Sequence, residues 1–204
     1  MAILVLDPGK EAQLRALWLT EGDVRATEVW EGMTVMSPLA NSDHQDLVGG
    51  LQFVLYDCVT RADLGVSFPG VNLSDRTPDW VQNYRNPDLV VFLAGTSAID
   101  YGTHWVGGPD FVVEIISPGE RPTAKFAFYE SIGTREVLVV HRDPWKLELF
   151  ALEGGQLKLT ASSDLTTATL CDSTALGLTF KLTPGRPRPR IAVTHPATGR
   201  TWSV

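Results

Sequence analysis

The spacing of hydrophobic and polar residues predicts a β-hairpin and then a long helix in the first third of the chain. Thr27–Trp30 and Met33–Met36 flank the pair Glu31-Gly32, with glycine where a tight hairpin turn needs a positive φ. Farther on, apolar residues recur at intervals of three and four, which predicts an amphipathic helix over about 43–61. Ser42 opens a capping-box pattern and is expected to cap this helix.

Three nearly continuous apolar runs predict the strands at the centre of a sheet. Their β-branched and aromatic residues are typical of strands buried on both faces, and they cover Pro87–Leu93, Asp110–Ile116 and Glu136–Val140. A helix is predicted over 123–132, between the second and third runs. This order predicts an α/β (α+β) fold with a central mixed β-sheet flanked by helices. The glycine-rich stretch 94–109 is expected as a loop bordering a cleft.

The chain divides into three predicted parts. Residues 1–24 are expected to form an N-terminal helical arm, residues 25–152 the core, and residues 153–204 an all-β extension of hairpins packed on the core. Within the extension, the proline-rich segment 184–190 is basic and stiff and is expected as a linker or an edge strand. As an alternative, its three arginines would contact phosphate groups if the partner is a nucleic acid.

Composition excludes several classes of protein. The 204 residues are 44% hydrophobic and 20% charged, as expected of a globular domain and not of a disordered chain. No apolar run approaches the roughly 18 residues of a membrane-spanning helix, and no secretion signal is recognisable, so a cytoplasmic protein without a membrane partner is expected. Cys58 and Cys171 lie far apart in the sequence, which argues against a disulfide framework or a zinc site.

Charge is distributed unevenly along the chain, whose net charge is −7. Up to Trp145 there are 10 Lys and Arg against 20 Asp and Glu, and from Lys146 onward there are 7 against 4. The acidic surplus argues against a protein that binds polyanions through a broad basic surface. It is compatible with a metal site, because such a site needs carboxylates.

One carboxylate stands inside a predicted buried strand and therefore needs a partner. Glu114 lies among valine and isoleucine residues, where an unpaired charge would cost several kcal/mol. Asp110 is on the same face of the strand but about 13 Å away, too far to share an ion directly. Asp88, at the head of the preceding strand, is close enough if the two strands pair. Two carboxylates and strand carbonyl oxygens would suit Mg²⁺ or Mn²⁺.

These acidic positions resemble a known group of nucleases. Pro87-Asp88 and Glu114-Ile115-Ile116 resemble the motifs of the PD-(D/E)XK nuclease superfamily. The chain more closely resembles one branch, the Uma-two family of restriction endonuclease-like proteins, over about residues 25–152. Further segments carry this resemblance as an ordered set: Glu28-Val29-Trp30-Glu31-Gly32, Met36-Ser37-Pro38, His44, Pro87-Asp88-Leu89-Val90-Val91, Val113-Glu114-Ile115-Ile116-Ser117-Pro118, Lys125, Tyr129, Gly133 and Glu136.

The resemblance implies a restriction-endonuclease-like core and a Mg²⁺-dependent (or Mn²⁺-dependent) endonuclease that hydrolyses DNA. Asp88 and Glu114 would hold the metal. The usual motif lysine is replaced by Ile116, and the family pattern assigns its role to Lys125. The same comparison implies that Glu28 is a further acidic site residue and that His44 hydrogen-bonds phosphate or water. DNA binding is then expected to need the divalent ion, and cutting two strands would suit a homodimer.

Departures from the family pattern leave other functions open. Arg121 stands where an Asp is usual, Val137-Leu138 where an aromatic pair is usual, and His141 where another Asp is usual. These changes would suit an altered substrate or a decayed enzyme, and Ile116 and Arg121 would mark an alternative in which the fold is a catalytically inactive module that binds nucleic acid or protein. A third possibility is a small anionic ligand bound by the stretch 94–109.

Each candidate site residue also has a purely structural interpretation. Asp88, at a strand head after proline, suits a turn or a cap, and Glu114 suits a buried ion pair. Lys125, His44 and Glu28 would in that case be ordinary solvated residues of a helix or a strand. The distance between the Asp88 and Glu114 carboxylates decides between these interpretations, because a shared metal needs them close together on one face.

Overall fold

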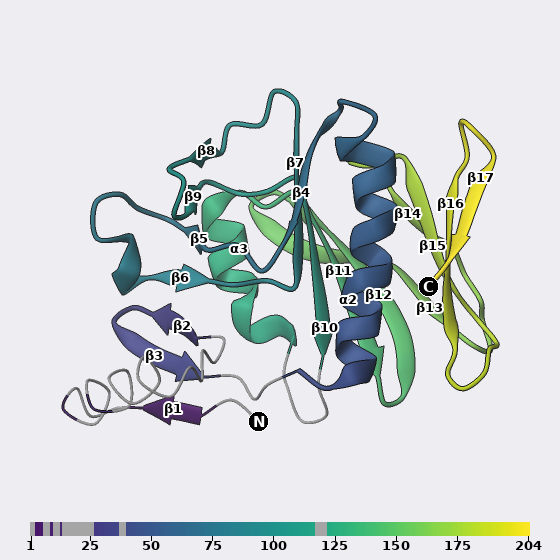
Figure 1. Ribbon diagram of the computed structural model, residues 1–204, viewed down its shortest axis with the longest axis horizontal. Helices are drawn as coiled ribbons and strands as arrows, with labels where there is room; N and C mark the ends of the chain where they lie inside the picture. Colours follow the sequence, from purple (N-terminus) through teal and green to yellow (C-terminus); the bar gives the residue numbers. More distant parts are fainter. Residues whose placement is uncertain (1–2, 6–8, 10–12, 14–26, 37–39, 117–121) are drawn as a thin grey trace.

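A computed structural model describes residues 3–5, 9, 13, 27–36, 40–116 and 122–204 (Figure 1). The helical arm predicted over 1–24 lies outside these residues, apart from strand β1 (Ile3–Val5) and two single positions. Helices α2 (Ser42–Leu55) and α3 (Phe126–Ile132) pack against β-sheets, which confirms the predicted fold class. Within the described residues, no helix is both long and apolar enough to cross a membrane.

The central sheet has six strands in the order β13-β12-β11-β10-β7-β4. Strands β10 and β11 pair in parallel, because the chain between them crosses over through the 3₁₀ turn η3 (Pro122–Lys125) and α3, and the other neighbours are antiparallel. The three predicted central strands are therefore confirmed as part of a mixed sheet. Its strands are β4 (Gly65–Pro69), β7 (Leu89–Leu93), β10 (Phe111–Ile116), β11 (Glu136–Arg142), β12 (Trp145–Glu153) and β13 (Gln156–Asp164).

Helix α2 covers one face of the central sheet. Its N-cap is Asn41, whose Oδ1 accepts from the His44 N–H at 3.0 Å, so the prediction of Ser42 as the cap was wrong by one residue. Asparagine is among the strongest capping residues, and the extended backbone of Asn41 lets its short side chain reach the third residue of the helix. The helix continues as a single π-helical stretch, η1 (Tyr56–Thr60), and thus ends close to the predicted position.

A four-stranded C-terminal sheet lies beside α2 on the same face (Figure 1). It consists of β14 (Cys171–Ser173), β15 (Leu178–Thr183), β16 (Arg190–His195) and β17 (Arg200–Ser203). The buried carboxylate of Glu136, at the start of β11, accepts hydrogen bonds from the Ser173 hydroxyl, the Thr174 hydroxyl and N–H, and the Ala175 N–H. This clamp fixes the C-terminal sheet to the core. The predicted boundary at 152/153 falls at the end of β12, within the β12–β13 hairpin.

The opposite face carries α3 and a seven-stranded sheet of short strands, in the order β1-β3-β2-β6-β5-β9-β8. The predicted hairpin is confirmed, with Glu31 at φ 48° and Gly32 at φ 81° in its turn. The stretch 94–109 contains two paired strands that were not predicted, because two residues each are too few to show a pattern. The bounds are β2 (Thr27–Trp30), β3 (Met33–Met36), β5 (Leu73–Ser74), β6 (Tyr84–Arg85), β8 (Ile99–Asp100) and β9 (Trp105–Val106), with the 3₁₀ turn η2 (Trp80–Gln82).

Candidate active site

Strands β7 and β10 bring Asp88 and Glu114 to neighbouring positions. The two strands pair antiparallel with Val113 opposite Leu89, and Asp88 and Glu114 are the next residue along each strand. Asp88 Oδ2 accepts the Ile115 N–H at 2.6 Å, which ties this carboxylate to the residue after Glu114. Because side chains alternate along a strand, both acids are on the face that carries α3.

Lys125 connects two buried glutamates. Its Nζ lies 2.8 Å from Glu28 Oε1 and 2.9 and 3.1 Å from the two carboxylate oxygens of Glu114. Glu28 comes from β2, Glu114 from β10 and Lys125 from η3, so three segments distant in sequence converge here. The two glutamate side chains are 7% and 8% exposed and Lys125 is 22% exposed, so the ammonium is the part of this trio that solvent reaches most easily.

Tyr129, one of the positions that carry the family resemblance, belongs to this cluster although it was not predicted as a site residue. Its hydroxyl donates a hydrogen bond to Glu114 Oε1, and its side chain is fully buried. Tyr129 and Lys125 are four residues apart, a spacing that puts both side chains on one side of the helical segment. This spacing was the available signal, since it directs a second polar group at whatever Lys125 contacts.

Burial and neighbouring charges shift the protonation of the cluster. Burial raises the pKa of Glu114 to about 7, helped by the negative charges of Asp88 and Glu28 and opposed by Lys125 and by the Tyr129 hydrogen bond. Burial acts to lower the pKa of Lys125, but the charges of Glu114 and Glu28 outweigh it and raise that pKa above the usual value. Lys125 therefore remains an ammonium while Glu114 titrates near neutral pH.

His44 contacts the other carboxylate of the site. It lies in the first turn of α2, and its Nε2 is 3.2 Å from Asp88 Oδ1. A carboxylate accepts hydrogen bonds, so Nε2 carries the proton that faces Asp88. Asp88 is thus held from two sides, by His44 and by the Ile115 N–H. The five predicted site residues accordingly form two groups. One is His44 with Asp88, and the other is Lys125 with Glu28 and Glu114. The hydrogen bond from the Ile115 N–H to Asp88 joins them.

The hairpin that carries Glu28 is held by a buried polar and aromatic support. Trp30 Nε1 donates to Glu28 Oε2 at 2.7 Å, and the Asn86 N–H donates to Glu28 Oε1 at 3.0 Å. The guanidinium of Arg85 lies between the rings of Trp30 and Phe128, 4.5 and 4.4 Å from their centroids. These contacts fix the orientation of Glu28 toward Lys125.

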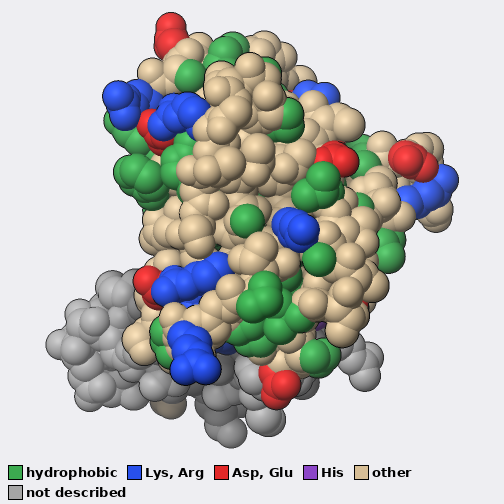
Figure 2. All heavy atoms as spheres, turned by 90° about the vertical axis from the view of Figure 1, so that its right-hand side faces the viewer, with side chains coloured by type: hydrophobic (Ala, Val, Ile, Leu, Met, Phe, Trp, Pro, Cys, Tyr) green, Lys and Arg blue, Asp and Glu red, His purple; other side chains and the backbone are tan. Residues whose placement is uncertain are grey.

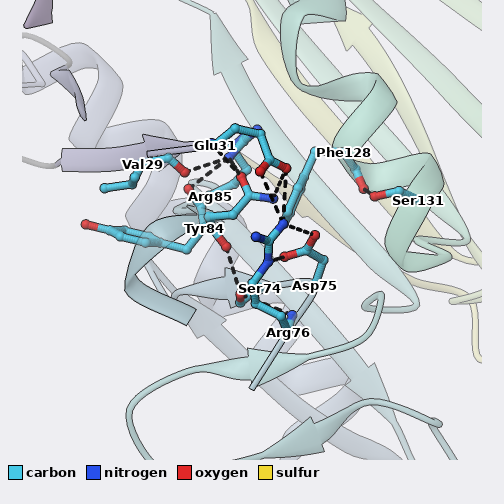
Figure 3. A network of polar contacts seen from close by, with 10 residues as sticks. Val29, Glu31, Ser74, Asp75, Arg76, Tyr84, Arg85, Phe128 and Ser131 are labelled. Carbon is cyan, nitrogen blue, oxygen red and sulfur yellow. Dashed lines mark hydrogen bonds and ion pairs between the residues drawn. The ribbon is translucent and has the colours of Figure 1, made fainter. Parts of the chain in front are cut away.

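Figure 3 shows the outer part of this support. Arg85 donates to the Val29 carbonyl at 2.9 Å, which joins β6 to β2. Arg76 lies between Asp75 and Glu31 and is bonded to both carboxylates, so the hairpin turn is tied to the segment after β5. The polar groups of this network bond to one another, so the network supports the hairpin.

Asp110 directly precedes strand β10 and Ile116 ends it, and within the described part of the chain neither side chain bonds to the Glu114 carboxylate. Asp110 accepts the Leu93 N–H at 2.8 Å and pairs with Arg135 at 2.8 Å, so its carboxylate joins strands. Ile116 is half-buried at the end of β10 and supplies no polar atom. Among the residues that the structure describes, no three His, Cys, Asp or Glu side chains converge as a metal-binding group.

Comparisons with known proteins bear on this arrangement. The family model Uma2, described as "Putative restriction endonuclease", matches residues 12–184. Among solved structures, the chain resembles a "putative nuclease belonging to DUF820" from Anabaena variabilis ATCC 29413, with a TM-score of 0.53 and 16% identity over 65% of this chain and 75% of that chain. At this identity the likeness shows a shared fold. None of the curated proteins matches the chain.

Proposed function

Because the chain belongs to the Uma2 family of restriction endonuclease-like proteins, we propose that it is a Mg²⁺- or Mn²⁺-dependent endonuclease that hydrolyses phosphodiester bonds of DNA. One observation supports this most strongly: Asp88 and Glu114 lie at adjacent positions of two paired strands, on one face, with the Lys125 ammonium bonded to Glu114. The ion pair between Lys125 and Glu114 does not involve Asp88, whereas a metal shared by the two strands would use it.

The chemistry of these residues fits a divalent cation. Asp88 and Glu114 supply two carboxylates from neighbouring strand positions, and Lys125 supplies one positive charge within bonding distance of Glu114 and of Glu28. The unbalanced negative charge helps to raise the pKa of Glu114 to about 7, which a bound cation would reverse. Oxygen ligands of this kind suit Mg²⁺ or Mn²⁺. Asp88 and Glu114 would hold the ion, which when bound activates water and neutralises charge on the phosphate.

The protein's own groups then position charge and protons. The Tyr129 hydroxyl donates a hydrogen bond to Glu114 Oε1 and holds that carboxylate in one orientation, as His44 Nε2 does for Asp88 Oδ1. Glu28 accepts from Lys125 Nζ and keeps the ammonium beside Glu114. A fixed ammonium at this point can stabilise negative charge that develops on a phosphate oxygen.

Lys125 also distinguishes this proposal from an inactive nuclease-fold module. The motif position two residues after Glu114 offers only the Ile116 side chain, but the Lys125 ammonium reaches the Glu114 carboxylate from η3. A cation is therefore present at the motif carboxylate although the motif lysine is missing from the strand. This favours catalysis over loss of activity.

Cleavage of mixed-sequence DNA by the purified protein with Mg²⁺ or Mn²⁺ tests the proposal. Asp88→Asn should lower the cleavage rate by at least about 100-fold and abolish the rise in melting temperature that Mn²⁺ causes, since a metal ion contributes several kcal/mol. Asp110→Asn is the matched control, because Asp110 also accepts a backbone N–H from a neighbouring strand. If Asp88→Asn and Asp110→Asn behave alike, or the unmodified protein does not cleave DNA, the proposal is wrong.

A further inference from the structure

Positive charge is concentrated in one short segment of the C-terminal extension. Three of the 17 Lys and Arg residues are Arg186, Arg188 and Arg190, which alternate with prolines up to the first residue of β16. The net charge of −7 combines −10 up to Trp145 with +3 from Lys146 onward. A DNA backbone approaching this acidic core needs local cations to offset repulsion.

Arg188 anchors this segment to the N-terminal part of α2, whose first turn supplies His44 to the candidate active site. Its Nη2 pairs with Asp46 Oδ2, and its guanidinium lies 5.9 Å from the centroid of the Trp145 ring. Asp46 is only two residues after His44, which contacts Asp88. The segment is therefore fixed to the first two turns of the helix that supplies a site residue. The Arg188 side chain is 11% exposed, so its role is attachment.

Arg186 and Arg190 carry charge that no acidic residue of the described chain neutralises. Arg190 Nη2 is 3.5 Å from the Arg186 carbonyl oxygen, and neither guanidinium has an ion pair within residues 27–36, 40–116 or 122–204. Arg186 is exposed and Arg190 half-buried. An arginine without a carboxylate partner keeps its full capacity to bind phosphate, often through two parallel hydrogen bonds.

A hollow and a further cation extend this surface. Arg188 and Arg190 line a hollow of about 290 Å³ together with Phe53 and Trp202, between α2 and the C-terminal sheet. Figure 2 shows this side of the molecule, where Lys and Arg side chains stand among hydrophobic ones and acidic side chains are scattered singly. On the side of the active site, Arg142 donates to Asn41 Oδ1 at 3.0 Å and to the carbonyl of Ile116 at 3.3 Å, at the end of the strand that bears Glu114.

We propose that Arg186 and Arg190, attached to α2 through Arg188, bind the phosphate backbone of DNA outside the cleavage point. This inference rests on the proposed nuclease function and assigns a role to the C-terminal extension. The contacts are to phosphates and carry no sequence information, so they strengthen binding to all DNA sequences equally. Their signature is a dependence of affinity on salt, because each arginine bound to phosphate releases condensed counterions.

The test measures binding of a labelled mixed-sequence duplex by fluorescence anisotropy at several salt concentrations, with Ca²⁺ in place of Mg²⁺. Arg190→Ala should reduce the slope of log K against log salt by about 0.9, and Arg186→Ala with Arg190→Ala by about 1.8. Lys158→Ala, which removes one charge at the far end of the β12–β13 hairpin, should leave the slope unchanged. The melting temperature of each variant verifies that it is folded.

The outcomes separate this inference from the nuclease proposal. If the unmodified protein binds and cleaves DNA but the arginine variants keep its salt slope, the inference is overturned and the nuclease proposal stands. An equal loss of slope in Lys158→Ala would also overturn the inference, since the slope would then depend on the total charge of the protein and not on the position of the arginines. If the unmodified protein neither binds nor cleaves DNA, both fail.

Discussion

Replacing Lys125 with methionine should destabilise the protein, and by more at high pH than at low pH. Methionine keeps the length of the side chain but removes the ammonium that lies within 3.1 Å of both Glu28 and Glu114. Leaving buried carboxylates without their partner costs roughly 3–5 kcal/mol, and the 22% exposure of Lys125 places the effect at about 3 kcal/mol. In a chain of 204 residues this corresponds to a melting temperature lower by roughly 6–12 °C.

The pH dependence follows from the raised pKa of Glu114. Its pKa of about 7 lies above the usual 4.5, so its contribution to stability is complete below pH 4.5 and is lost as the pH rises through 7. Lys125 lowers the pKa of Glu114, so its removal raises that pKa further. The loss of stability as Glu114 ionises then continues to higher pH. The difference in the free energy of unfolding between the unmodified protein and Lys125→Met should therefore widen from about 1 kcal/mol at pH 5.5 to about 3 kcal/mol at pH 8.5.

Urea unfolding at both pH values measures this gap, with Lys158→Met as a control on an exposed lysine. The reasoning is refuted if the gap between Lys125→Met and the unmodified protein is the same at the two pH values. It is equally refuted by a gap below about 1 kcal/mol at pH 8.5, since that would mean the carboxylates do not depend on the ammonium.

Two further substitutions test the groups around the cluster. Tyr129→Phe removes the hydrogen bond that lowers the pKa of Glu114, so the pKa should rise above about 7 and the acid limb of the cleavage rate should move to higher pH. An unchanged pH profile would show that Tyr129 does not act on Glu114. Glu136→Gln weakens the hydrogen bonds to residues 173–175 and should cost about 2 kcal/mol in urea unfolding, whereas the exposed Glu153→Gln should cost nothing measurable. Equal stability of these two variants would contradict the clamp.

The sequence was sufficient where one local rule determines the structure. The hairpin around Gly32 was predictable because its turn needs a positive φ, and the central strands because β-branched runs bury on both faces. The cap of α2 was predicted one residue late, since Asn41 and Ser42 are both good caps and the choice depends on backbone geometry. Strands β8 and β9 left no pattern, because pairing with other segments defines them.

The candidate site likewise contains residues that a local rule identifies and contacts that only tertiary packing creates. Glu114 stood out because a carboxylate in an apolar strand requires a partner, and the strand register then places Asp88 next to it. The contact between Lys125 and Glu28 could not be derived from spacing, because the two residues are 97 positions apart and meet only through tertiary packing. The site role of Tyr129 was not predicted for a related reason: a tyrosine in a helix is usually part of the core, and only the position of Glu114 gives its hydroxyl a role.

The C-terminal sheet also has a consequence for the order in which the chain can fold during synthesis. The α2 face of the central sheet is completed by Phe180, Leu182, Ile191 and Val193, and the Phe180 ring stacks on Phe111 at 5.7 Å between centroids. A nascent chain that ends before Val193 leaves apolar side chains of the central strands uncovered on that face. The site residues, Tyr129 included, are all made by residue 129, but the core that supports them closes only after roughly sixty more residues leave the ribosome. During that interval the nascent protein depends on protection from aggregation.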